Sequence, residues 1–176
     1  RVLFRSIMKD LENGIFYEKG LLFPVITPRF LPSCSENLLK GLGELASKYN
    51  LPIQSHISES KDVMKICSLL RDAYQGSTRD LEVFHRCSLL TKKTVLAHGV
   101  HLNSNERAIL SESGSSISHC PLSNIYFANG VLPVRKCLEE GVKIGLGTDV
   151  AGGYSPTMLS AMRHTVLSST MLTEGV

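Results

Sequence analysis

The 176-residue sequence lacks the features that mark membrane-spanning, nucleic-acid-binding and disulfide-rich proteins. No stretch approaches the roughly 18 uncharged apolar residues that a membrane-spanning helix needs. The net charge is only +3 and no run of like charge occurs, so we expect no nucleic-acid partner and no membrane partner. The five cysteines are odd in number and form no C-x-x-C pair. They are therefore predicted to be free, buried thiols in a reducing, cytoplasmic compartment.

Motifs of several enzyme classes are also absent. No G-x-G-x-x-G follows the first predicted strand, which argues against a dinucleotide-binding domain. The sequence contains no H-E-x-x-H, P-C-x-x-C, G-x-S-x-G or P-loop motif. Zincins, small zinc deaminases, α/β-hydrolases and P-loop nucleotidases are therefore excluded. The adjacent His119 and Cys120 show no arrangement that would activate a thiol nucleophile.

Short apolar runs alternate with helical patterns along the chain. Strands are predicted from residue 21 to about Thr27, and at residues 51–57, 93–99, 115–121 and 142–149. Helices are predicted from a capping box that joins Ser33 to Glu36, at 62–70, 104–113 and 133–140, and from an N-cap at Ser155. The apolar side chains expected to face inward from the last helix are Met158, Leu159, Met162 and Val166.

This alternation predicts an α/β fold with parallel strands joined by crossover helices. An open doubly wound sheet and a (β/α)8 TIM-type barrel both fit the pattern. A complete barrel needs about 250 residues, so the chain is expected to form a partial barrel of about strands 4–8. We treat residues 1–176 as one partial catalytic barrel domain. Because the sequence begins at Arg1 and not at Met, the N-terminal barrel strands are expected upstream.

Chemically capable residues stand at the ends of the predicted strands: Arg29, His56, His98, His119 and Asp149. Each one alone has a structural explanation, such as a hydrogen-bonded core histidine, an aspartate that caps a loop or a surface ion pair. In a parallel barrel, however, the active site lies at the carboxyl ends of the strands. The shared position therefore predicts a common site. The other three histidines are assigned structural roles: His85, His101 and His164.

Imidazole and carboxylate groups are good ligands for zinc or iron. A catalytic metal lowers the pKa of a bound water, and the resulting hydroxide attacks an electrophilic carbon. A nearby carboxylate is suited to move the proton of that water to a leaving group. Glu59 lies three residues after His56 and is the candidate for this task. The alternative is that Glu59 is only a first-turn charge that faces a helix dipole.

Five segments of the sequence resemble the guanine deaminase family of the amidohydrolase superfamily: "TPRF", "QSHISES", "AHG", "SHCPLSN" and "VKIGLGTDVAGGYS". The resemblance runs from about Pro24 to Thr170. It implies a (β/α)8 barrel with one zinc that hydrolyses guanine to xanthine and ammonia in purine metabolism. It also implies a small-molecule substrate and a cytoplasmic homodimer for the complete protein.

The resemblance also assigns roles to residues. It implies that His56 and Asp149 are zinc ligands, that Glu59 is the proton shuttle, and that His98 orients the zinc-bound water. Asp149 is also expected to take part in proton transfer. Arg29 and Phe30 are expected to contact the purine, in a substrate site that includes His56 and Glu59.

One departure from the family is clear. The family takes two further zinc ligands from an H-x-H motif on its first strand, and this sequence contains no H-x-H. We therefore expect residues 1–176 alone to be inactive toward guanine and prone to associate. Two alternatives stay open: another amidohydrolase that acts on an aminopurine, a pterin or a triazine, and a truncated, non-catalytic binding module.

Overall fold

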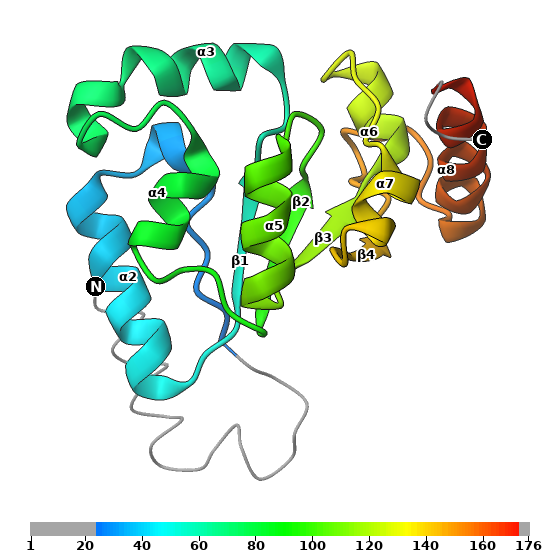
Figure 1. Cartoon of the computed structure of the whole chain (residues 1–176). Helices are drawn as coiled ribbons and strands as arrows, with labels where there is room; N and C mark the ends of the chain where they lie inside the picture. Colours follow the sequence, from blue (N-terminus) through cyan, green and yellow to red (C-terminus); the bar gives the residue numbers. More distant parts are fainter. Residues whose placement is uncertain (1–23, 173–176) are drawn as a thin grey trace, which may run out of the picture.

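Four parallel strands form one sheet in the computed structural model, which describes residues 24–172. They are β1 (Ile53–Ile57), β2 (Thr94–His98), β3 (Ser116–His119) and β4 (Lys143–Leu146), in the order β1-β2-β3-β4. Figure 1 shows that strands adjacent in sequence are also adjacent in the sheet. The carboxyl ends of all four strands therefore lie at the same edge, where a shared site was predicted.

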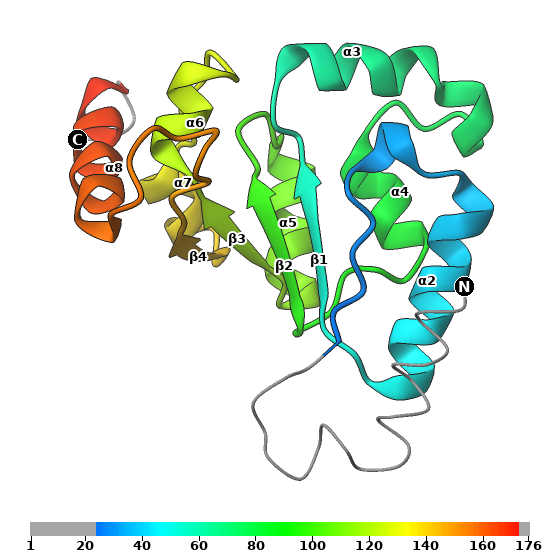
Figure 2. The ribbon, with the colours of Figure 1, turned by 180° about the vertical axis from the view of Figure 1, so that it is seen from behind.

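Helices connect the strands and follow them along the chain. They are η1 (Leu31–Ser33), α2 (Glu36–Tyr49), α3 (Lys61–Leu69), η2 (Arg71–Tyr74), α4 (Asp80–Arg86), α5 (Ser104–Ser113), α6 (Pro121–Tyr126), α7 (Val134–Glu139) and α8 (Met158–Met171). Helix α5 lies in front of β1 and β2 in Figure 1 and behind them in Figure 2, so it covers one face of the sheet. No helix of the described part is long and apolar enough to cross a bilayer.

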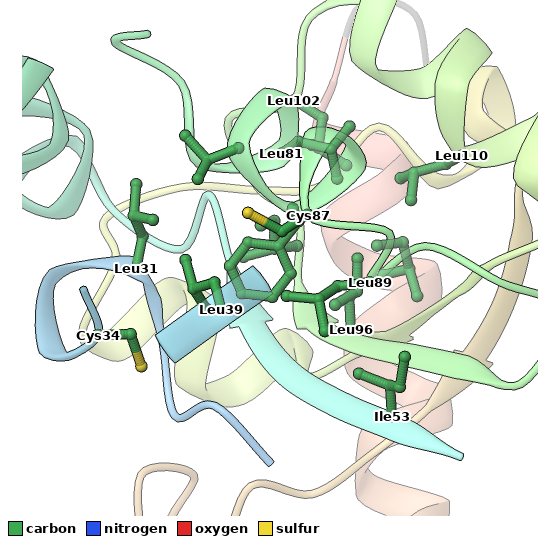
Figure 3. Packing of buried hydrophobic residues seen from close by; sticks show 14 of the residues in the cluster. Leu31, Cys34, Leu39, Ile53, Leu81, Cys87, Leu89, Leu96, Leu102 and Leu110 are labelled. Atoms are coloured by element: carbon green, nitrogen blue, oxygen red, sulfur yellow. The ribbon is translucent and has the colours of Figure 1, made fainter. Parts of the chain in front are cut away.

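Alternation along the strands determines which side chains enter the core. In β1 and β2 every second residue is buried, and Gln54 and Val95 between them are exposed. Ile53 and Leu96 belong to one core cluster with Leu39 of α2, Leu81 of α4 and Leu89 of the connection before β2, all labelled in Figure 3. Each fully buried leucine or isoleucine contributes about 1.5–3 kcal/mol relative to an exposed one. This core holds the strand ends in place.

The five cysteines are free and buried, as the sequence predicted: Cys34, Cys67, Cys87, Cys120 and Cys137. Burial raises the pKa of Cys67 to about 12 and that of Cys137 to about 11. A thiol with such a pKa carries almost no thiolate near neutral pH. These two cysteines therefore act as small apolar residues of the core.

The start of the chain differs from the prediction. In place of a strand from residue 21 to about Thr27, the described residues contain an isolated parallel bridge between Ile26 and Ile53, and residues 21–23 lie outside the described range. The predicted capping residue Ser33 was also wrong, because it lies in η1 and its hydroxyl donates to the carbonyl of Phe30. Helix α2 is capped by Ser35, whose side chain accepts from the backbone N–H of Leu38. Pro32 lies at the start of η1, a position that favours proline, and η1 adds a turn before α2 begins.

The last helix also differs from the prediction. Its N-cap is Thr157 and not Ser155, because the hydroxyl of Thr157 accepts from the backbone N–H of Ser160. All four side chains expected to face inward are exposed, between 46% and 63%: Met158, Leu159, Met162 and Val166. The buried positions are Ala161 and Ser168. Small residues allow α8 to approach α6 and β4 closely, so the inward face is the small one and not the most apolar one.

Candidate active site

Three of the predicted site residues meet at the carboxyl ends of β1 and β2. The rings of His56 and His98 stack with centroids 5.4 Å apart and an interplanar angle of 22°. Glu59 lies in the loop after β1, and its Oε1 is 3.7 Å from Nε2 of His98. The glutamate side chain is 28% exposed and the histidine side chain is 1% exposed. A carboxylate that solvent can reach thus stands beside two imidazoles at the sheet edge.

Backbone contacts fix the orientation of the His56 ring. Its Nδ1 lies 2.7 Å from the carbonyl oxygen of Arg29, and its backbone N–H donates to the same oxygen at 3.0 Å. A carbonyl only accepts, so Nδ1 carries the hydrogen and Nε2 keeps its lone pair. This is the arrangement that commonly orients a histidine ligand of a metal. The chemistry of His56 therefore fits a metal ligand.

Arg29 and Phe30 lie next to this histidine. The Arg29 guanidinium is 5.8 Å from the centroid of the Phe30 ring, and Arg29 is exposed. Among residues 24–172, Arg29 forms no ion pair, which argues against the surface-ion-pair explanation. Five guanidinium N–H groups can only donate, so this side chain is suited to a ligand that offers acceptors.

Asn124 connects two buried histidines behind the site. Its Oδ1 lies 2.9 Å from Nδ1 of His98, and its Nδ2 lies 3.2 Å from Nδ1 of His119. All three side chains are almost completely buried. The amide oxygen accepts from His98, which leaves Nε2 of His98 as an acceptor, and the amide N–H donates to His119. Among the described residues, Nε2 of both histidines has no hydrogen-bond partner.

The environment keeps His119 neutral. Burial and, to a smaller extent, the neighbouring His98 lower the pKa of His119 to about 4. With its Nδ1 accepting from Asn124, His119 carries its hydrogen on Nε2. Sequence reasoning placed His119 at a strand end but missed Asn124. The signal for Asn124 was its position in the "SHCPLSN" segment, in the first turn of the helix that follows His119.

Asp149 lies in the loop after β4 and is half-buried. A side chain at Gly152 would come within 2.8 Å of Oδ2 of Asp149 and 3.2 Å of Oγ of Ser123, so the turn needs a glycine there.

The Cys120 thiol lies close enough to Asp149 and Glu59 for their charges to affect its pKa. Burial raises its pKa to about 11, and the charges of Asp149 and Glu59 act in the same direction. Cys120 therefore stays a thiol.

The structure does not join all the predicted metal ligands directly. Within residues 24–172, no hydrogen bond or ion pair links the Asp149 carboxylate to His56 or Glu59. The same residues contain no group of three histidines, cysteines or acids that could surround a metal ion. His56 and Asp149 thus offer suitable donors at the same sheet edge, and the described chain provides no third one.

Backbone conformation is unusual at these strand ends. Of the seven described residues other than glycine that have left-handed φ angles, three stand at strand ends: Ser58 at 44°, His98 at 75° and Asp149 at 48°. Each such conformation costs on the order of 1–3 kcal/mol and persists only where the surroundings enforce it. Such residues cluster at functional sites, and here they turn the chain at the ends of β1, β2 and β4.

The described residues define a class, that of α/β folds with a parallel sheet, and the histidines and acids at the carboxyl edge of this sheet are residue types that suit hydrolytic chemistry. The chain belongs to the amidohydrolase family, whose sequence profile matches residues 4–175. It is 46% identical over 155 residues to the probable guanine deaminase of Schizosaccharomyces pombe, a match that covers 88% of this chain and 29% of that protein.

Solved structures of guanine deaminases are also similar to this chain. Guanine deaminase from E. coli superposes with a TM-score of 0.80 at 32% identity, over 88% of this chain and 36% of that one. Guanine deaminase from C. acetobutylicum with guanine in its active site superposes with a TM-score of 0.75 at 34% identity, over 82% and 34%. The chain therefore spans about a third of the length of the relatives it matches.

Proposed function

We propose that the protein containing this chain hydrolyses guanine to xanthine and ammonia, as a step of guanine catabolism. The observation that carries the proposal is the cluster of Glu59, His56 and His98 at the ends of β1 and β2. Its residue types suit proton transfer to and from a water. The similarity to guanine deaminases supports guanine as the substrate.

The proposal includes the scaffold and the metal. The described strands would belong to a (β/α)8 barrel, as about strands 4–8, with residues 1–176 as one segment of the catalytic domain. His56, through Nε2, and Asp149 would hold a zinc ion together with ligands from outside the described residues. Zinc bound there would lower the pKa of a water and so favour hydroxide. Because the described residues offer only these two ligands, residues 1–176 alone are expected to be inactive.

Glu59 would move the protons of the reaction. The water oxygen adds to the carbon that bears the amino group, and Glu59 takes one proton of the water and gives it to the adjacent ring nitrogen. The second proton passes from the new hydroxyl to the amino nitrogen, which leaves as ammonia. The product carbon becomes a carbonyl, so water and guanine give xanthine and ammonia in balance. Asp149, at the same sheet edge, would assist the second transfer.

The other residues would orient water and substrate. His98 would accept a hydrogen bond from the water at Nε2, because Asn124 holds the hydrogen of this ring on Nδ1. Arg29 would donate to acceptors of the purine, and Phe30 would pack against its face. For the complete protein we also propose a cytoplasmic homodimer, by analogy with the family.

A substrate panel tests this proposal. The protein containing this chain, supplied with zinc, is incubated with guanine, adenine, pterin and melamine, and released ammonia is measured together with xanthine. We expect guanine to give the highest kcat/KM and xanthine to accumulate in equal amount with ammonia. A preference for pterin or melamine would replace guanine by another amidohydrolase substrate. Guanine binding without turnover would support the non-catalytic alternative.

A further inference from the structure

Two adjacent residues at the start of α4 contact both loops that carry the proposed proton-transfer groups. We propose that Arg79 and Asp80 are positioning residues, which hold the loop of Glu59 in a fixed place relative to His98. The inference deepens the proposed function and rests on it. We refer to these two residues as the Arg79–Asp80 bracket.

Asp80 holds the loop after β1. Its side chain is almost completely buried, at 1% exposure. Oδ2 accepts the backbone N–H of Ser58 at 2.6 Å, and Oδ1 accepts the Ser58 hydroxyl at 2.7 Å and the backbone N–H of Leu81 at 2.9 Å. Ser58 directly precedes Glu59 and has a left-handed φ of 44°. The carboxylate therefore stabilises the strained turn that directs Glu59 away from the strand.

Arg79 holds the loop after β2. Its Nη2 donates to the carbonyl of His101 at 2.7 Å, and its Nε donates to Oε1 of Glu106 at 2.9 Å. Glu106 in turn accepts the backbone N–H of Asn103 at 2.8 Å, as part of the capping box of α5. The loop that follows His98 is thus tied to Arg79, the residue next to the one that holds the loop of Glu59.

The two loops also bond to each other. The backbone N–H of Gly99 donates to the carbonyl of Ile57 at 2.9 Å, and the N–H of His101 donates to the carbonyl of Ser58 at 3.0 Å. With the bracket, these bonds close a network around both strand ends. Helix α4 is itself fixed, because Leu81 and Phe84 are completely buried in the core, where Figure 3 shows Leu81.

Such rigidity has a function in proton transfer. The Glu59 carboxylate lies 3.7 Å from His98, and a shift of about 1 Å in such a group can reduce turnover by about a hundredfold. Asp80 is buried beneath the loop and has no access to a substrate, so its contribution would be to position Glu59 and not to react. This distinguishes the bracket from the groups at the sheet edge.

The principal test is Asp80→Asn in the protein containing this chain. In either orientation the amide places an N–H against the backbone N–H of Ser58 or of Leu81, so one hydrogen bond becomes a repulsive contact. We expect kcat for guanine to fall about tenfold to a hundredfold, while KM changes less than about threefold and zinc content stays constant. Ser58→Ala, which removes only the hydroxyl bond, should give a smaller loss of kcat.

Thr94→Val is the matched control. Thr94 is buried at the opposite end of β2, where its hydroxyl donates to the carbonyl of Leu89 at 2.8 Å. This variant loses a buried hydrogen bond without touching either loop, and it should lower stability while leaving kcat unchanged. An equal loss of kcat in Thr94→Val and Asp80→Asn would show that general destabilisation explains both, and would overturn the inference.

A double-mutant cycle shows whether Asp80 acts through Glu59. In a Glu59→Gln background, Asp80→Asn should reduce kcat by less than about twofold, because the group that it positions no longer transfers protons. A further reduction as large as in the wild-type background would overturn the inference. Near-normal turnover of Glu59→Gln alone would instead refute the proton-transfer role of Glu59 on which the inference rests.

A measurement that needs no activity distinguishes a failure of this inference from a failure of the proposed function. Hydrogen exchange of the Gly99 and His101 amides should be faster in Asp80→Asn by at least about tenfold, because both amides bond across the two loops. The Gly147 amide, which bonds to the carbonyl of His119 at 2.9 Å, serves as the internal reference. Unchanged exchange at Gly99 and His101 would overturn the bracket even if the protein proved to have another substrate.

Discussion

His119 makes the stability of the site depend on pH in a predictable direction. In the folded protein, burial and the neighbouring His98 lower the pKa of His119 from its ordinary value of 6.5 to about 4. The unfolded chain therefore binds a proton at a higher pH than the folded chain does. Stability is unaffected well above the ordinary pKa of histidine, and it is lost as the pH falls toward the pKa of the folded state.

The size of the loss follows from the shift in pKa. Between about pH 7.5 and about pH 5, His119 should remove about 2 kcal/mol from the free energy of unfolding, and further acidification to about pH 4 should remove about one more. The assay is urea-induced unfolding of the wild type and of His119→Asn, each at about pH 7.5 and at about pH 5. Asparagine stays neutral, and its amide oxygen can accept from Asn124 where the ring nitrogen did.

The quantity to compare is the change in the free energy of unfolding with pH, and not the free energy of unfolding at one pH. His119→Asn should lose about 2 kcal/mol less than the wild type between the two pH values, even if it is less stable at both. His85→Asn is the control, because it makes the same change of residue type at an exposed position outside the site. Equal pH dependence of the wild type and His119→Asn would refute the conclusion that the fold holds a neutral imidazole there.

Three further predictions concern individual residues of the site. His56→Ala should lose most of the bound zinc, measured by elemental analysis of the purified protein, and full zinc occupancy would remove His56 from the ligands. Arg29→Ala should raise KM for guanine at least about tenfold with little change in the unfolding midpoint, because charged hydrogen bonds to a ligand are strong; an unchanged KM would exclude the guanidinium from substrate binding. Asn124→Leu should lower the free energy of unfolding by about 2–4 kcal/mol, because two buried imidazole nitrogens lose their partner; a loss below about 1 kcal/mol would show that water replaces the amide.

The sequence predicted well those elements that local signals define. Helix α5 was expected at 104–113, and it spans Ser104–Ser113, with Gly114 in the left-handed conformation at its end. Strands β1 to β3 were expected within residues 51–57, 93–99 and 115–121, and they lie inside these ranges. Apolar periodicity and helix-ending glycines are properties of neighbouring residues, so sequence alone reveals them.

The features that the sequence did not predict depend on tertiary packing. The buried face of α8 consists of small residues because neighbouring elements approach closely there, which an apolar pattern cannot reveal. The short helices α4 and α6 were missed, and with them Asp80 and Asn124. Both residues act on histidine-bearing strand ends 22 to 26 positions away in the chain. Contacts over such separations become visible only in the folded structure.

Glu59 is the residue on which the proposed mechanism depends most directly. The decisive measurement is kcat for guanine of Glu59→Gln and of the wild type, with zinc content determined on the same samples. Glutamine keeps the size of the side chain and removes its ability to accept a proton. We expect kcat to fall by at least about a hundredfold with zinc fully retained, since general acid–base catalysis contributes about that much or more. A variant that keeps its zinc and turns over guanine at nearly the wild-type rate would contradict the assignment of proton transfer to Glu59.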